Sequence, residues 1–277
     1  MANFSSLILT RNEALNLPAC LAALGGCDDI VVLDSNSEDD TRAIARRYGA
    51  RVFQRPFDDY AGQRNYGLHQ LEFKYEWVLM IDADEILTSE LEAEIDAFVS
   101  SAARDTTLVF ARRKDFLFGR WLKHSSGYPT WFGRLMQPRR VWVERGINEE
   151  YHTQGQSAYL QGHLHHYPFN KGFKAWFDKH NRYSSMESEL LLASKGGIFV
   201  QSATTDTPAM ARRKRIKALA YRLPLRPLVV FTALFFLRRG FLDGRAGLIF
   251  CCLRGCYEFM IDCKLREARY RRAGRPV

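Results

Sequence analysis

Short apolar runs and longer amphipathic stretches alternate along the first 113 residues. The short runs are rich in β-branched residues and predict buried strands, whereas apolar residues three or four positions apart predict helices. Strands are expected at residues 5–10, 29–34, 51–54, 77–81 and 107–113, and helices at residues 12–24, 38–49, 60–71 and 88–99. This alternation favours an α/β fold with a mostly parallel, Rossmann-like sheet and helices on both faces.

Polar residues indicate where two of these helices begin. Ser35 or Ser37 is in position to cap the second helix, because a hydroxyl oxygen accepts from the free backbone N–H groups at a helix start. Ser89 and Glu92 have the spacing of a capping box and predict the start of the fourth helix.

Carboxylates gather where the predicted strands end. The fourth strand runs directly into Asp82, Asp84 and Glu85, and two earlier strands end at Thr10 and Asp34. In parallel sheets of this kind, ligands bind outside the carboxyl ends of the strands. The sequence therefore predicts an acidic crevice at that edge of the sheet.

A divalent cation is the partner that this crevice favours. The chain contains neither GxGxxG nor GxxxxGK[ST], so glycine-rich phosphate loops of the Rossmann and P-loop kinds are not expected. Mg²⁺ or Mn²⁺ takes oxygen ligands, commonly one or two carboxylates plus substrate phosphates. Asp82 and Asp84 reach one ion if the strand end turns; otherwise one caps a helix and the other is solvated.

Charge is distributed unevenly along the chain. The net charge is +9, but residues 211–277 carry 17 Lys and Arg against 4 Asp and Glu, whereas the first 210 residues carry 23 against 27. A basic segment with contiguous apolar surface favours an anionic membrane interface and disfavours nucleic acid as a partner. The alternative is an ordinary helical subdomain that packs on the sheet.

The second part of the chain is predicted to be helical, including residues 172–196 and 208–223. Its apolar runs at residues 228–237 and 246–253 are shorter than the ~20 residues that a spanning helix needs. The six cysteines form no CxxC pair, which favours reduced thiols and the cytosol. The N-terminus has no basic region of the kind that opens a signal peptide.

Several segments together resemble the family-2 glycosyltransferases, which have the GT-A fold. The segments that carry the resemblance occur in this order: LTRNEALNL, VVLDSNSEDDT, QRNYGL, WVLMIDADE, YPTWFGRLMQ, GINEEYH, KHNRYSSMES and RRGFLDGRAGL. They span nearly the whole chain. Within the family, the sequence looks most like the β-1,4-glucosyltransferases of the lipopolysaccharide core.

The resemblance implies a site for a nucleotide-sugar. By this likeness Thr10, at the end of the first strand, would be part of the nucleotide-sugar site, and Asn12 and Glu13 after it would lie near the nucleobase and ribose. Asp34 would hydrogen-bond the uracil or the ribose, and Arg64 would line the nucleotide pocket.

The resemblance also implies a metal site next to the nucleotide. Asp82 would contact the ribose or the metal, and Asp84 would ligate the metal that bridges the diphosphate. Some related enzymes supply a late histidine to the metal, so His165 or His166 would complete the site. The alternative is that these histidines are structural and hydrogen-bonded.

An inverting transferase needs a base that takes the proton from the acceptor hydroxyl. The family often has a [VI]-H-E stretch, and the matching residues here are Ile147, Asn148 and Glu149. Asn148 replaces the histidine, so Glu149 is the predicted base and the adjacent Glu150 is the alternative. A purely structural interpretation makes both of them exposed loop acids.

The likeness places Trp131 and Arg134 near the acceptor. Arg134 would meet a phosphate or a carboxylate, or else would pair with an aspartate of the crevice. Arg112, Arg113 and Lys114 follow a predicted strand and are expected to be solvated.

These features predict two domains. Residues 1–168 form a GT-A catalytic domain, and residues 169–277 form a helical, basic, membrane-associating region. The implied activity is inverting transfer of a hexose, glucose above all, from a UDP-sugar to a lipopolysaccharide-core or other lipid-linked glycan at the inner face of a bacterial cytoplasmic membrane. The alternatives are a metal-dependent nucleotidyltransferase and a non-catalytic basic protein that binds membrane or RNA.

Overall fold

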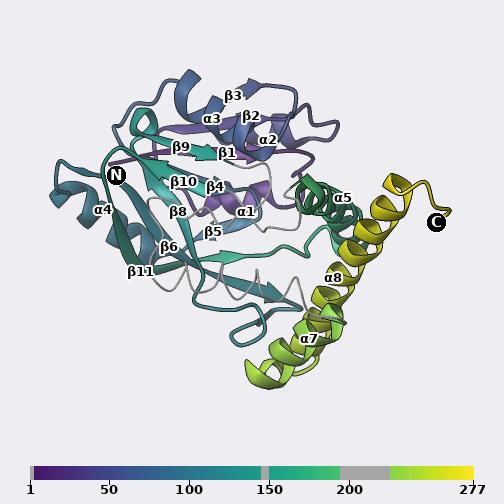
Figure 1. Cartoon of the computed structure of the whole chain (residues 1–277). Coiled ribbons are helices and arrows are strands. Elements are labelled where there is room, and N and C mark those ends of the chain that lie inside the picture. Colours follow the sequence, from purple (N-terminus) through teal and green to yellow (C-terminus); the bar gives the residue numbers. More distant parts are fainter. Residues whose placement is uncertain (1–2, 145–149, 194–224) are drawn as a thin grey trace. The chain divides into compact units, whose positions relative to one another are not determined.

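The chain divides into two compact units in a computed structural model (Figure 1). Unit 1 consists of Met1–Asp115 and Pro129–Asn170, and unit 2 consists of Phe116–Tyr128 and Lys171–Val277. The structure describes three stretches of the chain: residues 3–144, 150–193 and 225–277. The predicted helix at residues 208–223 and the predicted base Glu149 lie outside these stretches.

Unit 1 is built on one mixed sheet with the strand order β3-β2-β1-β4-β8-β6-β11-β5. In that order the strands are Arg51–Gln54, Ile30–Asp34, Ser5–Thr10, Val78–Asp82, Trp131–Met136, Thr106–Leu117, Gln156–His166 and Glu85–Leu87. Along this order, β8 and β5 run antiparallel to their neighbours and the other pairings are parallel. The short strand β7 (Arg120–Trp121) pairs antiparallel with β6 outside this order. The predicted mostly parallel α/β sheet is confirmed, with three antiparallel strands added among the described residues.

Helices cover both faces of this sheet. They are α1 (Leu17–Ala22), α2 (Thr41–Arg47), α3 (Tyr60–Gln70) and α4 (Ser89–Ser101), and a short 3₁₀ turn η1 follows at Pro138–Arg140. Residues of α1, α2 and α4 share a buried core with alternate residues of the strands. A second, two-stranded sheet pairs β9 (Val141–Glu144) with β10 (Glu150–Thr153).

The opposite face of the sheet is covered by α3, and Gly67 explains how closely that helix approaches. A Cβ added at Gly67 would lie 2.7 Å from Cδ2 of Leu7 and 3.5 Å from Cδ2 of Leu33. Leu7 belongs to β1 and Leu33 to β2, so a larger side chain would push α3 away from the centre of the sheet.

The starts of two helices differ from those predicted. The N-cap of α2 is Asp40, because the hydroxyl of Ser37 instead donates to Asp34 at 2.5 Å. The N-cap of α4 is Thr88 rather than Ser89, because Thr88 is still extended and its Oγ1 accepts from the backbone N–H of Leu91 at 3.3 Å.

The described residues of unit 2 form helices and one hairpin. Its elements are α5 (Gly172–Ala193), α7 (Arg226–Thr232), the π-helical turn η2 (Ala233–Leu237), the 3₁₀ turn η3 (Gly240–Asp243) and α8 (Gly244–Arg272). All six cysteines of the chain are free. Among the described residues, no helix combines the length and apolar character needed to cross a membrane.

The hairpin at Phe116–Tyr128 belongs to unit 2, which corrects the prediction that residues 1–168 form one domain. It contains β7 (Arg120–Trp121), which pairs with the last residues of β6. The reason is Asp243, whose buried carboxylate accepts from the backbone N–H of Ser125 at 2.7 Å and from that of His124 at 3.0 Å. These bonds attach the hairpin to the helical unit.

Candidate functional site

The carboxylate at the end of β2 is fully engaged within the protein. Asp34 is 0% exposed. Its Oδ1 accepts from the hydroxyls of Thr10 at 2.9 Å and Ser37 at 2.5 Å, and its Oδ2 accepts from the backbone N–H of Ser37 at 2.8 Å. Asp34 therefore fixes the loop after β2 in this structure, and its direct contact with a nucleotide stays a prediction.

The loop after β1 is tied to the same region. Asn12 has a φ of +54°, in the left-handed region that asparagine tolerates better than most residues. Its backbone N–H donates to Ser37 Oγ at 2.8 Å, and its side-chain oxygen accepts from the backbone N–H of Glu38 at 2.8 Å. The backbone N–H of Glu13 donates to Thr41 Oγ1 at 2.7 Å. These bonds place Asn12 and Glu13 at the carboxyl edge of the sheet.

The carboxylate at the end of β4 is held by arginines instead. Asp82 has a side chain that is 28% exposed, and it receives Arg64 at 3.2 Å on Oδ1 and Arg134 at 2.9 Å on Oδ2. Burial by itself would raise the pKa of Asp82, but the guanidinium groups of Arg134 and Arg64 outweigh it and hold that pKa well below its usual range. Asp82 is therefore ionised at neutral pH.

Glu85, the first residue of β5, is completely buried beneath this pair. Its Oε1 accepts from Arg134 at 2.6 Å and lies 3.5 Å from Arg113, whose guanidinium stacks 4.0 Å from the ring centre of Phe132. Burial lowers the pKa of Arg134, and the charges of Glu85 and Asp82 more than offset that effect. Of the two roles predicted for Arg134, the structure therefore shows pairing with a crevice aspartate.

A second group of charges meets at Asp84. His166 Nε2 lies 3.3 Å from Asp84 Oδ2, and His166 Nδ1 lies 2.6 Å from Asp115 Oδ1. Burial and Arg113 act to lower the pKa of His166, but the two carboxylates outweigh them and raise it to about 9. Arg113 Nε lies 3.1 Å from Asp115, so the two groups join. We call the joined set the charged network; its members are Asp82, Asp84, Glu85, Asp115, Arg64, Arg113, Arg134 and His166.

Three of the four predicted metal ligands belong to this network, namely Asp82, Asp84 and His166, and of these Asp84 and His166 contact each other. His165 points to the other face of β11, where it pairs in register with Lys114 and Ile86, because side chains alternate along a strand. Asp82 is engaged by arginines. In the part of the chain that the structure describes, no three His, Cys, Asp or Glu side chains are placed to hold a metal ion.

The pair of Asp84 and His166 nevertheless fits a cation that takes its remaining ligands from a substrate. Mg²⁺ is commonly held by one or two carboxylates together with substrate phosphates. Asp84 is 21% exposed at its side chain. Asp115 engages Nδ1 of His166 and directs Nε2 toward Asp84, which is the usual outer support of a metal-binding histidine.

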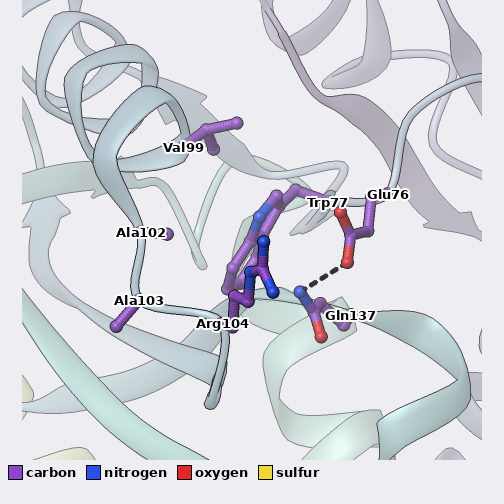
Figure 2. A pocket seen from close by; sticks show the side chains of 7 residues that line it. All are labelled: Glu76, Trp77, Val99, Ala102, Ala103, Arg104 and Gln137. Carbon is purple, nitrogen blue, oxygen red and sulfur yellow. Dashed lines mark hydrogen bonds between the residues drawn. The ribbon is translucent and has the colours of Figure 1, made fainter.

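A cavity of about 430 Å³ lies away from these charges, beyond the amino end of β4 (Figure 2). Its lining includes Trp77, Arg104 and Gln137, and Gln137 donates to Glu76 at 2.9 Å. The candidate site is the carboxyl edge rather than this hollow, because titratable groups with strongly shifted pKa values mark functional clefts.

Comparison with known proteins identifies the family. The sequence model described as Glycosyl transferase family 2 matches residues 5–174. The chain belongs to this family. Uncharacterized glycosyltransferases of Rickettsia felis and Rickettsia prowazekii are each 26% identical to it, over 97% and 96% of this chain and 91% and 88% of theirs. The lipopolysaccharide core biosynthesis glycosyltransferase LpsC of Rhizobium meliloti is 32% identical over 39% of this chain and 42% of its own.

Solved structures resemble this glycosyltransferase more weakly. A glucosyl-3-phosphoglycerate synthase from Mycobacterium tuberculosis, in complex with Mn²⁺, UDP-glucose and phosphoglyceric acid, superposes with a TM-score of 0.36 and 18% identity. The superposition covers 50% of this chain and 57% of that chain. The mixed α/β unit with its central sheet is consistent with the GT-A fold, and the family membership displaces the nucleotidyltransferase and non-catalytic alternatives.

Of the two predicted bases of the glycosyltransferase, the structure describes only Glu150. Glu150 is the first residue of β10, is 8% exposed and faces Glu144 in the register of the small sheet. It is thus a buried strand residue rather than an exposed loop acid. Glu149 lies outside the described residues, and its role stays a prediction.

Trp131 is the first residue of β8. Its ring lies edge-on to Tyr159 at 5.2 Å between ring centres, and the Arg112 guanidinium lies 5.6 Å from its ring centre. Its contact with an acceptor stays a prediction.

Sequence reasoning missed two members of the charged network. Arg113 was expected to be solvated and Asp115 was not considered, whereas Glu85 was predicted as a carboxylate of the crevice without a specific role. A signal was present, because Ala111, Arg113 and Asp115 alternate along one strand and therefore share a face. Extending the predicted strand beyond residue 113 would have placed Arg113 and Asp115 beside the crevice.

Proposed function

We propose that unit 1 binds a UDP-sugar at the carboxyl edge of its sheet and transfers the hexose, with inversion, to a hydroxyl of a lipid-linked saccharide. The observation that carries this proposal is the meeting of Asp84 with His166 at 3.3 Å in a family-2 glycosyltransferase. The pair offers an oxygen ligand and, once the cation has displaced the proton from Nε2 of His166, a nitrogen ligand at the edge where ligands of parallel sheets bind.

Asp84 and His166 would hold Mg²⁺ or Mn²⁺. When bound, such an ion neutralises the charge that develops on the leaving nucleoside diphosphate. The protein's own part is to keep both ligands in place. Asp115 fixes the His166 ring, and the backbone oxygen of Asp84 accepts from the N–H of Tyr167 at 2.9 Å. Ligands held in advance in this way cost little reorganisation during the reaction.

Arg64, Arg134 and Asp82 complete the donor side. Both arginines are at least 96% buried, with exposures of 4% and 2%, so their positions are set before any ligand arrives. Asp82 keeps 28% of its side chain exposed and is the proposed acceptor of ribose hydroxyl groups. Glu149, or else Glu150, is the proposed base for the acceptor hydroxyl.

We propose a lipid-linked acceptor at the cytoplasmic face of a membrane. The similarity to a protein named for lipopolysaccharide core biosynthesis supports this class of acceptor. Unit 2 also exposes large apolar side chains at the start of α7 and in the turns η2 and η3, namely Leu225, Leu228, Phe236, Leu237, Phe241 and Leu242. Arg238 and Arg239, between these turns, are exposed as well. Exposed apolar surface next to arginines suits the interface of an anionic bilayer.

Calorimetry of UDP binding tests the donor site. We expect binding in the presence of Mn²⁺ that weakens by about 10-fold or more with EDTA or in Asp84→Ala. Asp105→Ala is the matched control, because Asp105 is an exposed carboxylate that precedes β6 at the opposite edge of the sheet. UDP binding that is indifferent to both Mn²⁺ and Asp84 would remove the metal-dependent mechanism.

Vesicle flotation tests the membrane proposal. The protein should float with vesicles that contain anionic lipid and should stay in solution with neutral ones. Leu237→Ser together with Phe241→Ser should abolish flotation and leave UDP binding unchanged. Flotation that survives this double substitution would exclude the apolar surface of unit 2 as the contact.

A further inference from the structure

Basic side chains gather on the face of the sheet opposite the charged network. The strands β8, β6 and β11 are neighbours, and residues paired across them point to the same face. Trp131 of β8 pairs with Arg112 of β6, and Arg112 pairs with His163 of β11. Two residues further along the strands, and therefore on the same face, Lys114 pairs with His165. We call these five residues the basic face.

The side chains of the basic face lie close to one another. The rings of His163 and His165 stack with 5.5 Å between their centres, and the guanidinium carbon of Arg112 is 5.6 Å from the ring centre of Trp131. The ring of Tyr159 packs edge-on against that of Trp131, with 5.2 Å between the ring centres. All of these side chains are half-buried rather than fully solvated.

These bases disfavour one another's charge. Burial, followed by Lys114 and His165, lowers the pKa of His163 to about 4. Burial and Arg112 lower the pKa of Lys114, and burial and Lys114 lower that of His165. Glu90 at the start of α4 acts in the opposite direction on all three, but it is exposed and does not offset these effects.

Arg112 gives a second, geometric indication. Its Nε is buried and has no hydrogen-bond partner among the described residues. A buried donor without a partner costs free energy, and crowded like charges add to that cost. Natural proteins tolerate such conflicts chiefly at functional sites. The alternative, a face that serves packing alone, explains the aromatic rings but not the four bases beside them.

We propose that the basic face binds an anionic group, a phosphate or a carboxylate, of the acceptor saccharide, with Trp131 against a sugar ring. This inference rests on the proposed glycosyl transfer. Arg112 and Lys114 alternate along β6 with Arg113 and Asp115 of the charged network. The basic face therefore lies beside the donor edge but on the other side of the sheet, so its ligand is a group removed from the reacting hydroxyl. Arginine suits it because its planar donors match phosphate and carboxylate oxygens.

Proton NMR of the histidine rings tests the site with inorganic phosphate as the probe. We expect saturable shifts of the His163 and His165 resonances in the full-length protein. The apparent affinity should fall by about 10-fold in the double variant Arg112→Gln/Lys114→Gln. Arg104→Gln/Arg139→Gln is the matched control, because it removes the same charge from exposed residues elsewhere in unit 1. Absence of saturable shifts in the wild type, or equal weakening in both double variants, would overturn the proposal.

Calorimetry with UDP separates an acceptor site from the donor's own phosphates. The Arg112→Gln/Lys114→Gln variant should bind UDP with Mn²⁺ within about twofold of the wild type, as expected for sites that do not share partners. Loss of UDP binding in this variant would assign the basic face to the donor and overturn the acceptor assignment. If the wild type itself did not bind UDP, the proposed function would fail while the phosphate titration still decided the anion site. Circular dichroism at increasing temperature confirms that each variant is folded.

Discussion

The ends of β2 and β4 both carry a carboxylate at the same edge of the sheet, yet their surroundings differ. Asp34 is 0% exposed. Its two oxygens accept hydrogen bonds from the hydroxyl of Thr10 at the end of β1 and from the hydroxyl and backbone N–H of Ser37 in the loop after β2. Asp82 and Asp84 are 28% and 21% exposed at their side chains, and their partners are arginine and histidine side chains. The first environment fixes a loop, whereas the second leaves both carboxylates partly exposed and therefore accessible to a ligand.

The charged network also explains why a cation and a diphosphate would bind together. It contains four carboxylates and four basic groups, linked by ion pairs among the described residues. Buried charges are tolerated when they are paired. A divalent cation alone would unbalance this network, and so would a diphosphate alone, but the two nearly cancel. Asp34 has one arginine nearby, Arg42 at 3.8 Å, and no comparable set of ion pairs among the described residues.

The largest loss of stability is expected from a substitution in the charged network at the end of β4. Arg134→Met leaves Asp82 and Glu85 without the guanidinium that bridges them. Because removing one partner of a buried ion pair strands a charge, we expect a loss of about 3–5 kcal/mol in the free energy of unfolding. Urea denaturation measures it. Arg104→Met, at an exposed arginine, should change stability by less than about 0.5 kcal/mol. Equal effects of the two substitutions would show that the network is not a stabilising unit.

A smaller loss is expected at the end of β2. Asp34→Asn replaces an acceptor oxygen with an N–H₂ group that faces the donors of Ser37 and Thr10. We expect destabilisation by about 1–3 kcal/mol, the usual result of leaving buried polar groups unpaired. A denaturation curve that matches the wild type would show that the loop does not depend on this carboxylate.

Asp115→Asn loosens the support of His166 without removing a proposed ligand. Outer partners of metal-bound histidines typically contribute about 10-fold or more to metal affinity. We therefore expect weaker Mn²⁺ binding in the presence of UDP, measured by the decrease of the free Mn²⁺ signal in electron paramagnetic resonance. Asp105→Asn is the control, since that carboxylate is exposed and lies outside the network. Unchanged Mn²⁺ affinity in Asp115→Asn would exclude His166 as a ligand that depends on Asp115.

The smallest loss of stability is expected from a substitution next to Asp34, at the end of β1. Thr10→Val removes one hydroxyl donor to Asp34 while preserving the shape of the side chain. Net hydrogen-bond contributions suggest a loss of about 0.5–1.5 kcal/mol, with UDP affinity unchanged. If UDP affinity fell while stability did not, Thr10 would contact the nucleotide and the two strand ends would share that role.

Sequence patterns predicted the first half of the sheet well. The strand at Arg51–Gln54 has the predicted limits, and β1, β2 and β4 lie within one residue of theirs. Each of β1, β2 and β4 contains at least three consecutive apolar residues. The strands β8 and β9 were not predicted because they are short and lie outside the alternation of strands and helices in the first 113 residues, and polar residues interrupt β10 and β11. Arg113 is the clearest case: its position beside Glu85 depends on pairing between distant segments.

The role of Asp34 was hidden from the sequence for a related reason. Its Thr10 partner lies 24 positions away, and only the parallel pairing of β1 with β2 brings the two together. The assignment of Phe116–Tyr128 to unit 2 likewise depends on Asp243, more than 100 positions away. Local patterns predict elements and strand ends, but they do not reveal which carboxylates already have partners.

The most direct test compares Mn²⁺-dependent UDP binding, by calorimetry, in Asp84→Asn and Asp34→Asn under conditions where both variants are folded. We predict that Asp84→Asn loses the Mn²⁺-dependent part of the affinity, by about 10-fold or more, while Asp34→Asn retains it. The opposite pattern, with Mn²⁺ dependence lost in Asp34→Asn and kept in Asp84→Asn, would contradict the assignment of the donor site to the end of β4.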